Sequence, residues 1–223
     1  MSQTSILQGV PHPRDQRMLF DTEVDPTTGQ RKHDYYVDGK LYQGSVTGFV
    51  HDFFPVFDAD KVVDRIMASG KTESNPRYKY FGMTRQDILD RWELNRDTKS
   101  EAGTVAHDNI EQYTKGNAYD PTHPGIEGFN AFNAEFTASG EWVPWLAEWA
   151  VFNEDSGLGG CVDMVYARRS HVEAARKAGT LATAPIDLWL VDWKFTKDFE
   201  EVNNYGKTGF GPCEDLPDTN LYH

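Results

Sequence analysis

Two ionisable residues, Asp192 and Lys194, interrupt the otherwise apolar run Leu188–Phe195. If this run is a strand, alternation places both side chains on one face, about 7 Å apart. A second predicted strand, Gly159–Tyr166, carries Asp163 near its middle. Two carboxylates and a lysine on neighbouring strands can hold a divalent metal and a water beside a phosphate. These residues therefore predict metal-assisted chemistry on a phosphate group.

Three more residues able to bind a metal or transfer a proton precede these strands. His107 and Glu111 are four residues apart in a predicted helix, Glu101–Thr114, so they share one helix face. Glu148 opens another predicted strand, Glu148–Phe152. The chain thus presents an imidazole and a carboxylate on a helix, followed by carboxylates on successive strands.

Each of these residues also has an ordinary structural interpretation. Asp192 and Lys194 can form an ion pair on a solvated edge strand, where charges are common. His107 can be a hydrogen-bonded core histidine. Glu111 can be a solvated helix charge, and Glu148 can simply mark the edge of its strand. The metal-site interpretation is favoured because the residues occur together and in this order.

The elements that must position these residues are predicted from periodicity and capping signals. A turn at Asp25–Gly29 predicts a hairpin, and Asp38-Gly39 predicts a second tight turn. Residues 1–16 are expected to form a flexible arm. The predicted helices are Lys61–Ala68 with Asp58 or Asp60 as cap and Gly70 as end, one beginning after Thr84, Glu101–Thr114 with Ser100 as cap and Gly116 as end, Ile126–Ala138, and one capped by Ser170 and ended by Gly179.

This order predicts a single α/β (α+β) domain over residues 1–223, with a central mixed sheet flanked by helices. Its N-terminal part is expected to be mostly helical, apart from a peripheral arm and hairpin over residues 1–40. The strand Ile186–Phe195 is expected to complete the sheet, next to the strands around the Asp155–Gly157 turn.

Composition narrows the function classes. The net charge of −13 disfavours promiscuous electrostatic binding to nucleic acid, although it leaves room for a locally basic groove. Two cysteines are too few for a four-cysteine zinc site or an iron–sulfur cluster. They could pair, but a reduced protein is the simpler interpretation. Without a long apolar run or a secretory signal, we expect a soluble intracellular protein that is neither membrane-bound nor secreted.

Two groups of residues are candidates for contacting DNA. Ser45 and Thr47 precede an apolar run, where Ser and Thr ordinarily cap a helix; the functional alternative is a phosphate contact at the helix N-terminus. A basic cluster stands out on the acidic chain and is either a solvated surface or a DNA guide. Its members are Arg168, Arg169, Arg176 and Lys177.

Three motifs in order resemble the PD-(D/E)XK nuclease superfamily, in its RecB-like and lambda-type exonuclease branch. They are G-T-x-x-H-x-x-I-E at 103–111, G-G-C-V-D at 159–163 and V-D-W-K at 191–194. The nearest likeness is to mitochondrial genome-maintenance exonucleases and their relatives in large DNA viruses and phages. The resemblance implies a restriction-endonuclease-like core and a Mg²⁺- or Mn²⁺-dependent exonuclease that acts on linear DNA bound by its end. The expected setting is DNA replication, recombination or repair, at a viral replication site, a nucleoid or in the cytoplasm.

The resemblance also implies residue roles. His107, Asp163 and Asp192 would ligate the metal with the Trp193 carbonyl. Glu148 would be a further ligand. Lys194 would position or activate the attacking water, and Glu111 would be a catalytic carboxylate. Homo-oligomers occur in this branch, so the chain could form one.

One motif of the resemblance is missing. Relatives continue past the last strand into a helix bearing Q-x-x-x-Y, whereas this sequence reaches Leu221–His223 without it. We therefore expect either a truncated chain or a branch that has lost this helix. The alternative function is a catalytically impaired DNA-binding or assembly module on the same fold. A third, a carbohydrate-active protein, is suggested by acidity and six tryptophans, but no pair of catalytic carboxylates is evident.

Overall fold

The computed structural model describes residues 4–21, 23, 34–42, 44–196 and 206–216. Its α-helices are α1 (Val46–His51), α2 (Ala59–Ala68), α3 (Lys71–Ser74), α4 (Arg85–Lys115), α5 (Pro124–Thr137) and α6 (Arg169–Ala178). Its strands are β1 (Met18–Asp21), β2 (Asp34–Val37), β3 (Lys40–Leu41), β4 (Gly44–Ser45), β5 (Trp142–Asn153), β6 (Leu158–Arg168) and β7 (Leu188–Val191). Two 3₁₀ turns are η1 (Pro13–Arg17) and η2 (Gly211–Cys213).

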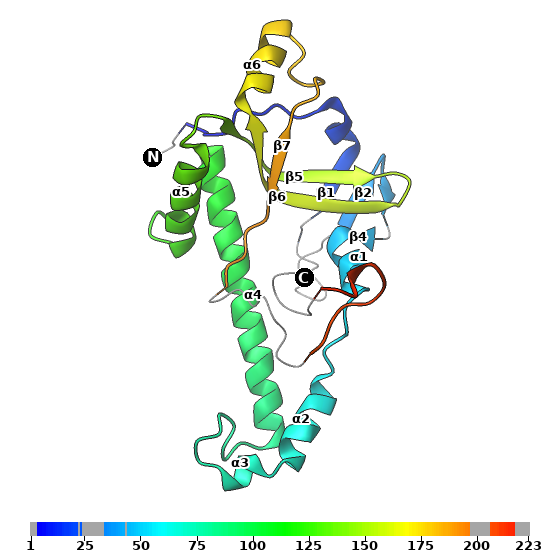
Figure 1. Ribbon diagram of the computed structural model, residues 1–223, viewed down its shortest axis with the longest axis vertical. Coiled ribbons are helices and arrows are strands. Elements are labelled where there is room, and N and C mark those ends of the chain that lie inside the picture. The colour runs from blue at the N-terminus through cyan, green and yellow to red at the C-terminus, as the bar shows by residue number, and fades with distance from the viewer. Residues whose placement is uncertain (1–3, 22, 24–33, 43, 197–205, 217–223) are drawn as a thin grey trace.

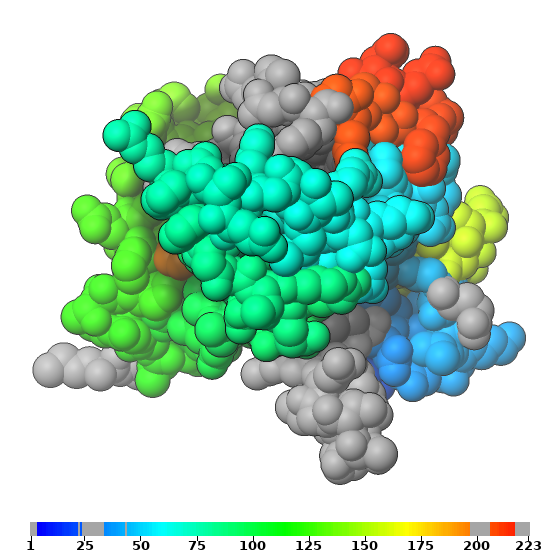
Figure 2. Space-filling view, turned by 90° about the horizontal axis from the view of Figure 1, so that it is seen from below, coloured from blue at the N-terminus to red at the C-terminus, as the bar shows by residue number. Residues whose placement is uncertain are grey.

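Helix α4 is the axis on which the other elements are arranged (Figure 1). Its 31 residues span about 46 Å at 1.5 Å per residue. The sheet and α5 lie along its C-terminal half, and α2 and α3 lie at its N-terminal end. There Val63, Tyr80 and Ile88 form a small core of their own. Figure 2 views this end, where α2, α3 and the start of α4 cover the near face.

The main sheet is built around β6. Strand β5 pairs antiparallel with one edge of β6 along its whole length. The other edge pairs parallel with β4 at Leu158–Gly159 and antiparallel with β7 at Met164–Ala167. Residues 160–163 of β6 lie between these two partners. Within the described residues, no strand pairs with this edge of β6 there. Asp163 is in this unpaired stretch.

Helices cover both faces of the sheet, which confirms the predicted α+β class. Met164 and Tyr166 of β6 pack with α4 and α5 around Phe129. The alternate residues, Val165 and Ala167, pack on the other face with Val172 of α6. This period-two alternation is what a strand buried on both faces requires.

The predicted break before Ser100 is wrong, because α4 is one uninterrupted helix. The expected start and end are confirmed: Thr84 caps α4 in a reciprocal capping box with Asp87, and Gly116 ends it in the left-handed conformation, φ 80°. Between Leu94 and Ser100 three residues are weak helix formers, Asn95, Asp97 and Thr98, but no residue there is proline or glycine. Weak propensity is overridden when both ends of a helix are packed.

Two further boundaries differ from the prediction. Strand β7 ends at Val191, so Asp192, Trp193 and Lys194 lie beyond it and strand alternation does not order them. Helix α6 begins at Arg169, and Ser170 does not cap it. The reason is tertiary: the Arg169 N–H donates to the Glu141 carbonyl at 2.7 Å, which satisfies a first-turn donor without a capping side chain.

The N-terminal region is a docked segment followed by strands. The predicted flexibility is wrong for the described residues, because the amides of Gln8 and Gly9 donate to the carbonyls of Pro144 and Trp145 in β5. The first hairpin is confirmed by antiparallel β1 and β2, although the predicted turn residues Asp25–Gly29 lie outside the described residues. A second turn at Asp38-Gly39 leads into β3, as predicted. Between this hairpin and strand β5 the chain is mostly helical, from α1 to α5, as expected.

No helix within the described part of the chain is both long and apolar enough to span a membrane.

Candidate metal centre

A cavity of about 560 Å³ lies between α4, the β5–β6 hairpin and the N-terminal hairpin. It contains six of the thirteen candidate site residues that the sequence singled out. The lining residues are Phe20, Tyr35, Thr47, Gly103, Thr104, His107, Asp108, Glu111, Lys115, Glu148, Cys161, Asp163 and Asp192. Five of them are carboxylates and one is a lysine, so the wall is strongly acidic.

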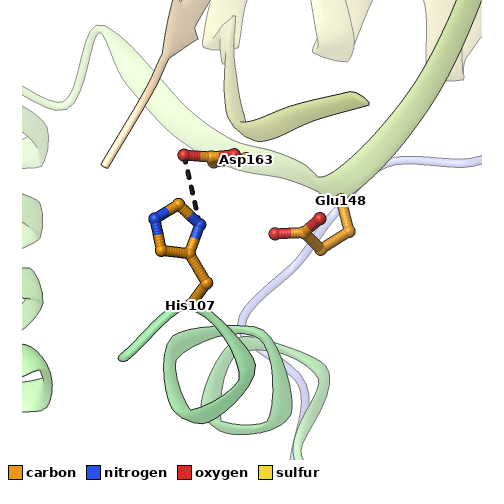
Figure 3. A group of neighbouring side chains, drawn as sticks. All are labelled: His107, Glu148 and Asp163. Carbon is orange, nitrogen blue, oxygen red and sulfur yellow. Dashed lines mark ion pairs between the residues drawn. The ribbon is translucent and has the colours of Figure 1, made fainter. Parts of the chain in front are cut away.

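His107, Glu148 and Asp163 form the centre of this cavity (Figure 3). One ligand atom from each lies within 4.8 Å of the others. His107 Nδ1 and Asp163 Oδ2 lie 3.5 Å apart. Cation–oxygen bonds of about 2.0–2.6 Å allow one ion to bridge atoms roughly 4–5 Å apart. The donor set therefore fits a divalent cation.

Each residue of this cluster is placed by a different local feature. His107 projects from α4, one turn before Glu111. Glu148 and Asp163 come from facing positions of β5 and β6, between the register pairs Ala147↔Met164 and Trp149↔Val162. Glu148 adopts a left-handed backbone, φ 48°, which is unusual for a residue with a Cβ. Strained residues cluster at functional sites, although Asp38 shows the same backbone conformation in an ordinary turn.

The backbone of Trp193 ties the cluster together. Its N–H donates to Asp163 Oδ2 at 2.6 Å, and its carbonyl accepts a hydrogen bond from His107 Nε2 at 2.9 Å. With Nε2 donating, Nδ1 is the ring nitrogen that faces Asp163. The ligand role of the Trp193 carbonyl stays a prediction.

Burial disfavours charge on the carboxyl groups of the cluster. It raises the pKa of Glu148, an effect that the hydrogen bond from Cys161 partly offsets. It also raises the pKa of Asp163, while His107 and the Trp193 N–H act in the opposite direction. In the absence of a cation these carboxyl groups are therefore unusually ready to hold protons.

Cys161 belongs to the cavity but was not among the predicted site residues. Its thiol donates a hydrogen bond to Glu148 Oε2 at 3.2 Å. Burial, followed by the nearby Glu148, raises the pKa of this thiol well above its ordinary value. The strand period could have identified it, because Cys161 and Asp163 are two residues apart and share a face. Within the described residues, both Cys161 and Cys213 are free thiols.

Asp192 and Lys194 are near the cluster but not part of it. Asp192 lines the cavity and raises the pKa of Asp163, which Lys194 lowers. Their own side chains pair at 3.0 Å and are 64% and 43% exposed. Lys194 is not among the cavity-lining residues. This contact is the ion pair considered as their ordinary interpretation, and their catalytic roles stay predictions.

The remaining predicted residues are divided between the cavity and the surface. Glu111 lines the cavity, where it pairs with Lys115, one turn further along α4. Thr47 also lines it. Ser45 is the N-cap of α1 and accepts a hydrogen bond from the Gly48 amide at 2.9 Å, which is the capping role expected by default.

None of the four residues of the basic cluster lines the cavity. Arg168 pairs with Glu141 and Asp187, and its guanidinium lies over the Trp142 ring. Arg176 and Lys177 are exposed in the last turn of α6, beyond the end of β6. The DNA-guiding role of this cluster stays a prediction, and the cluster does not line the cavity.

Comparisons with known proteins give this chain no relative: no protein family, no curated protein and no solved structure matches it.

Proposed function

We propose that this chain is a Mg²⁺- or Mn²⁺-dependent deoxyribonuclease that hydrolyses phosphodiester bonds, acting as an exonuclease on a restriction-endonuclease-like core. The observation that carries the proposal is the convergence of His107, Glu148 and Asp163 within 4.8 Å in an open acidic cavity. The three motifs that resemble the PD-(D/E)XK superfamily contribute His107, Asp163 and Asp192 to this region. The proposed setting is DNA replication, recombination or repair of the viral or organellar type.

The residues divide the chemistry between them. Asp163, Glu148 and His107 would hold the cation, with Asp192 and the Trp193 carbonyl as further proposed ligands. Carboxylate oxygens suit both Mg²⁺ and Mn²⁺, and the imidazole favours tolerance of Mn²⁺. When bound, the cation supplies Lewis acidity and an acidified water, so no serine or cysteine nucleophile is needed.

The other polar groups would orient the reactants. Lys194 would turn from Asp192 to the attacking water or to the phosphate, where an ammonium offsets the charge that develops. Glu111, on the α4 wall of the cavity, would accept a proton. Thr47 would contact the phosphate backbone from α1.

The test is the release of nucleotides from end-labelled linear DNA and from covalently closed circular DNA, with Mg²⁺, Mn²⁺ or EDTA. We expect metal-dependent digestion of the linear DNA only, and its loss in Asp163→Asn. Asp155→Asn, an exposed carboxylate in the turn of the same hairpin, is the matched control and should retain full activity. Absence of metal-dependent release from either DNA, by a folded protein, would refute the proposal.

A second candidate is a DNA-binding module that does not turn over. The observation in its favour is the exposed pairing of Lys194 with Asp192, outside the set of cavity-lining residues. This candidate predicts DNA binding in Ca²⁺ without cleavage in Mg²⁺ or Mn²⁺.

A further inference from the structure

Tyr35 is the one aromatic hydroxyl that lines the metal-centre cavity within the described residues. It comes from β2 in the N-terminal hairpin, more than 70 residues before His107, and no motif included it. The residue is 8% exposed. Buried hydroxyl groups nearly always have a hydrogen-bond partner. Among the residues that the structure describes, none hydrogen-bonds to this hydroxyl, and solvent still reaches its oxygen.

The ring of Tyr35 is held from two sides. Phe20, its cross-strand neighbour in β1, stacks on it with ring centroids 4.7 Å apart and planes 9° apart. On another side lies the bare backbone of Gly159, where a Cβ would come within 2.6 Å of Tyr35 Cγ. The ring is therefore fixed against the start of β6. The position of its hydroxyl oxygen is set before any ligand binds. A preorganised donor of this kind loses little entropy when a ligand arrives.

The electrostatic surroundings favour a neutral donor. Burial raises the pKa of Tyr35 to about 12, and Cys161 and Glu148, which line the same cavity, add to the effect. It stays protonated wherever the protein is folded at neutral pH. An anionic ligand in a cavity with five carboxylates needs hydrogen-bond donors that carry no negative charge. The Thr104 hydroxyl already donates to the Ser100 carbonyl. Few uncharged hydrogen-bond donors therefore remain in the cavity.

We propose that the Tyr35 hydroxyl binds the substrate of this site by donating a hydrogen bond to a non-bridging oxygen of the phosphodiester held at the His107–Glu148–Asp163 cluster. The inference rests on the proposed nuclease function and adds a specific contact to it. The N-terminal hairpin is then part of the binding site as well as a wall of the cavity. The ordinary alternative is that only the ring matters, as packing between the hairpin and β6.

Tyr35→Phe separates these two roles, because it keeps the ring, the Phe20 stack and the Gly159 contact and removes only the hydroxyl. Tyr36→Phe is the matched control, since Tyr36 lies on the opposite face of β2 and lines a different cavity. A hydrogen bond to a charged acceptor predicts a roughly 10- to 100-fold lower kcat/KM for Tyr35→Phe. The control should cleave like the wild type, and both variants should unfold at the wild-type temperature.

A phosphorothioate at the scissile position gives the decisive measurement. Sulfur is a poor hydrogen-bond acceptor, so replacing the one oxygen that Tyr35 contacts should remove most of the Tyr35→Phe penalty. We expect the penalty to shrink to about 3-fold or less for one diastereomer and to remain for the other. An equal penalty for both diastereomers, or full activity of Tyr35→Phe, overturns the inference even though the nuclease function stands.

Binding measurements keep the inference testable if the wild type does not cleave DNA. In Ca²⁺, Tyr35→Phe should bind an oligonucleotide roughly 10-fold or more weakly than the wild type and Tyr36→Phe. Equal affinities would overturn the role of Tyr35. A wild type that neither cleaves nor binds DNA would overturn both this inference and the proposed function.

Discussion

Glu148 and Asp163 face each other across the β5–β6 ladder, and Glu148 occupies its position with a left-handed backbone, φ 48°. The residues on either side of Glu148 keep the regular register with β6. The carboxylate of Glu148 points towards His107 and Asp163 (Figure 3). A second irregularity of the hairpin, a register shift between Pro144 and Leu146, lies earlier in β5. The strained backbone of Glu148 is consistent with a functional constraint.

The strain predicts an unusual order of stability among variants of Glu148. In an ordinary strand, glycine is less stable than alanine. At a left-handed position the Cβ costs about 1–2 kcal/mol, so Glu148→Gly should be more stable than Glu148→Ala by about 1 kcal/mol. Urea unfolding in EDTA measures the difference. Ala150→Gly, in the same strand, is the control and should be destabilising; if Glu148 follows the same order as Ala150, the position is not strained.

The raised pKa of Glu148 predicts how stability depends on pH without metal. In the folded state Glu148 holds its proton to a higher pH than in the unfolded state. Between these two pKa values the folded state binds more protons than the unfolded state. The contribution of Glu148 to the free energy of unfolding therefore falls as pH rises. Unfolding in EDTA should therefore show Glu148→Gln gaining stability relative to the wild type from acidic to neutral pH. A difference that does not change over this range would contradict the predicted shift.

A divalent cation should reverse this trend. Metal ligands must be deprotonated, so Mg²⁺ or Mn²⁺ should stabilise the wild type more as pH rises. Thermal unfolding at a series of pH values, with metal and with EDTA, measures the effect. Glu148→Gln and Asp163→Asn should each lose most of it. Equal metal stabilisation of the wild type and Asp163→Asn would place the ion elsewhere.

Variants of Lys194 distinguish a catalytic role of this residue from simple ion pairing with Asp192. If Lys194 acts in the transition state, Lys194→Ala should lower turnover by roughly 100-fold or more, on the order of 3 kcal/mol. DNA affinity in Ca²⁺ should change little, and Lys194→Arg should not rescue turnover, because a planar guanidinium does not replace a compact ammonium. If the exposed pair with Asp192 is its whole role, turnover is unchanged and the stability loss is below about 1 kcal/mol.

Gly159 is expected to be intolerant of any side chain. A Cβ at this position would lie 2.6 Å from Cγ of the Tyr35 ring, which Phe20 holds from another side. Gly159→Ala should therefore displace the N-terminal hairpin and destabilise the fold by about 1–3 kcal/mol. Gly128→Ala in α5 is the control: a Cβ there meets nothing within 4 Å and should be neutral or stabilising. Thermal unfolding of the two variants should separate them clearly.

Local signals in the sequence were sufficient to predict most secondary-structure elements. The caps at Thr84 and Gly116, the Asp38-Gly39 turn and the apolar face of α5 all depend on residues within a few positions of one another. The α+β class follows from their order. The spacing of His107 and Glu111 also placed both on one face of α4, because that relation is set by the helical period.

Other features depend on contacts between distant residues, and local patterns did not reveal them. The continuity of α4 through Ser100, and the start of α6 at Arg169 against the Glu141 carbonyl, come from tertiary packing and a tertiary hydrogen bond. Asp192 and Lys194 were expected on the strand, but β7 ends before them. Outside the strand, their side chains pair with each other and are not ordered by alternation.

The sequence by itself determined which residue types were available for metal chemistry and in which order they occur, since these are properties of the chain. Only the tertiary structure decided that Glu148 joins His107 and Asp163, because a local left-handed residue and the β5–β6 register direct its carboxylate. It also brought Tyr35 and Cys161 to the same cavity. Strand alternation could have predicted Cys161, because it lies two residues from Asp163. Tyr35 comes from a separate hairpin, and no local sequence pattern predicts how two hairpins pack together.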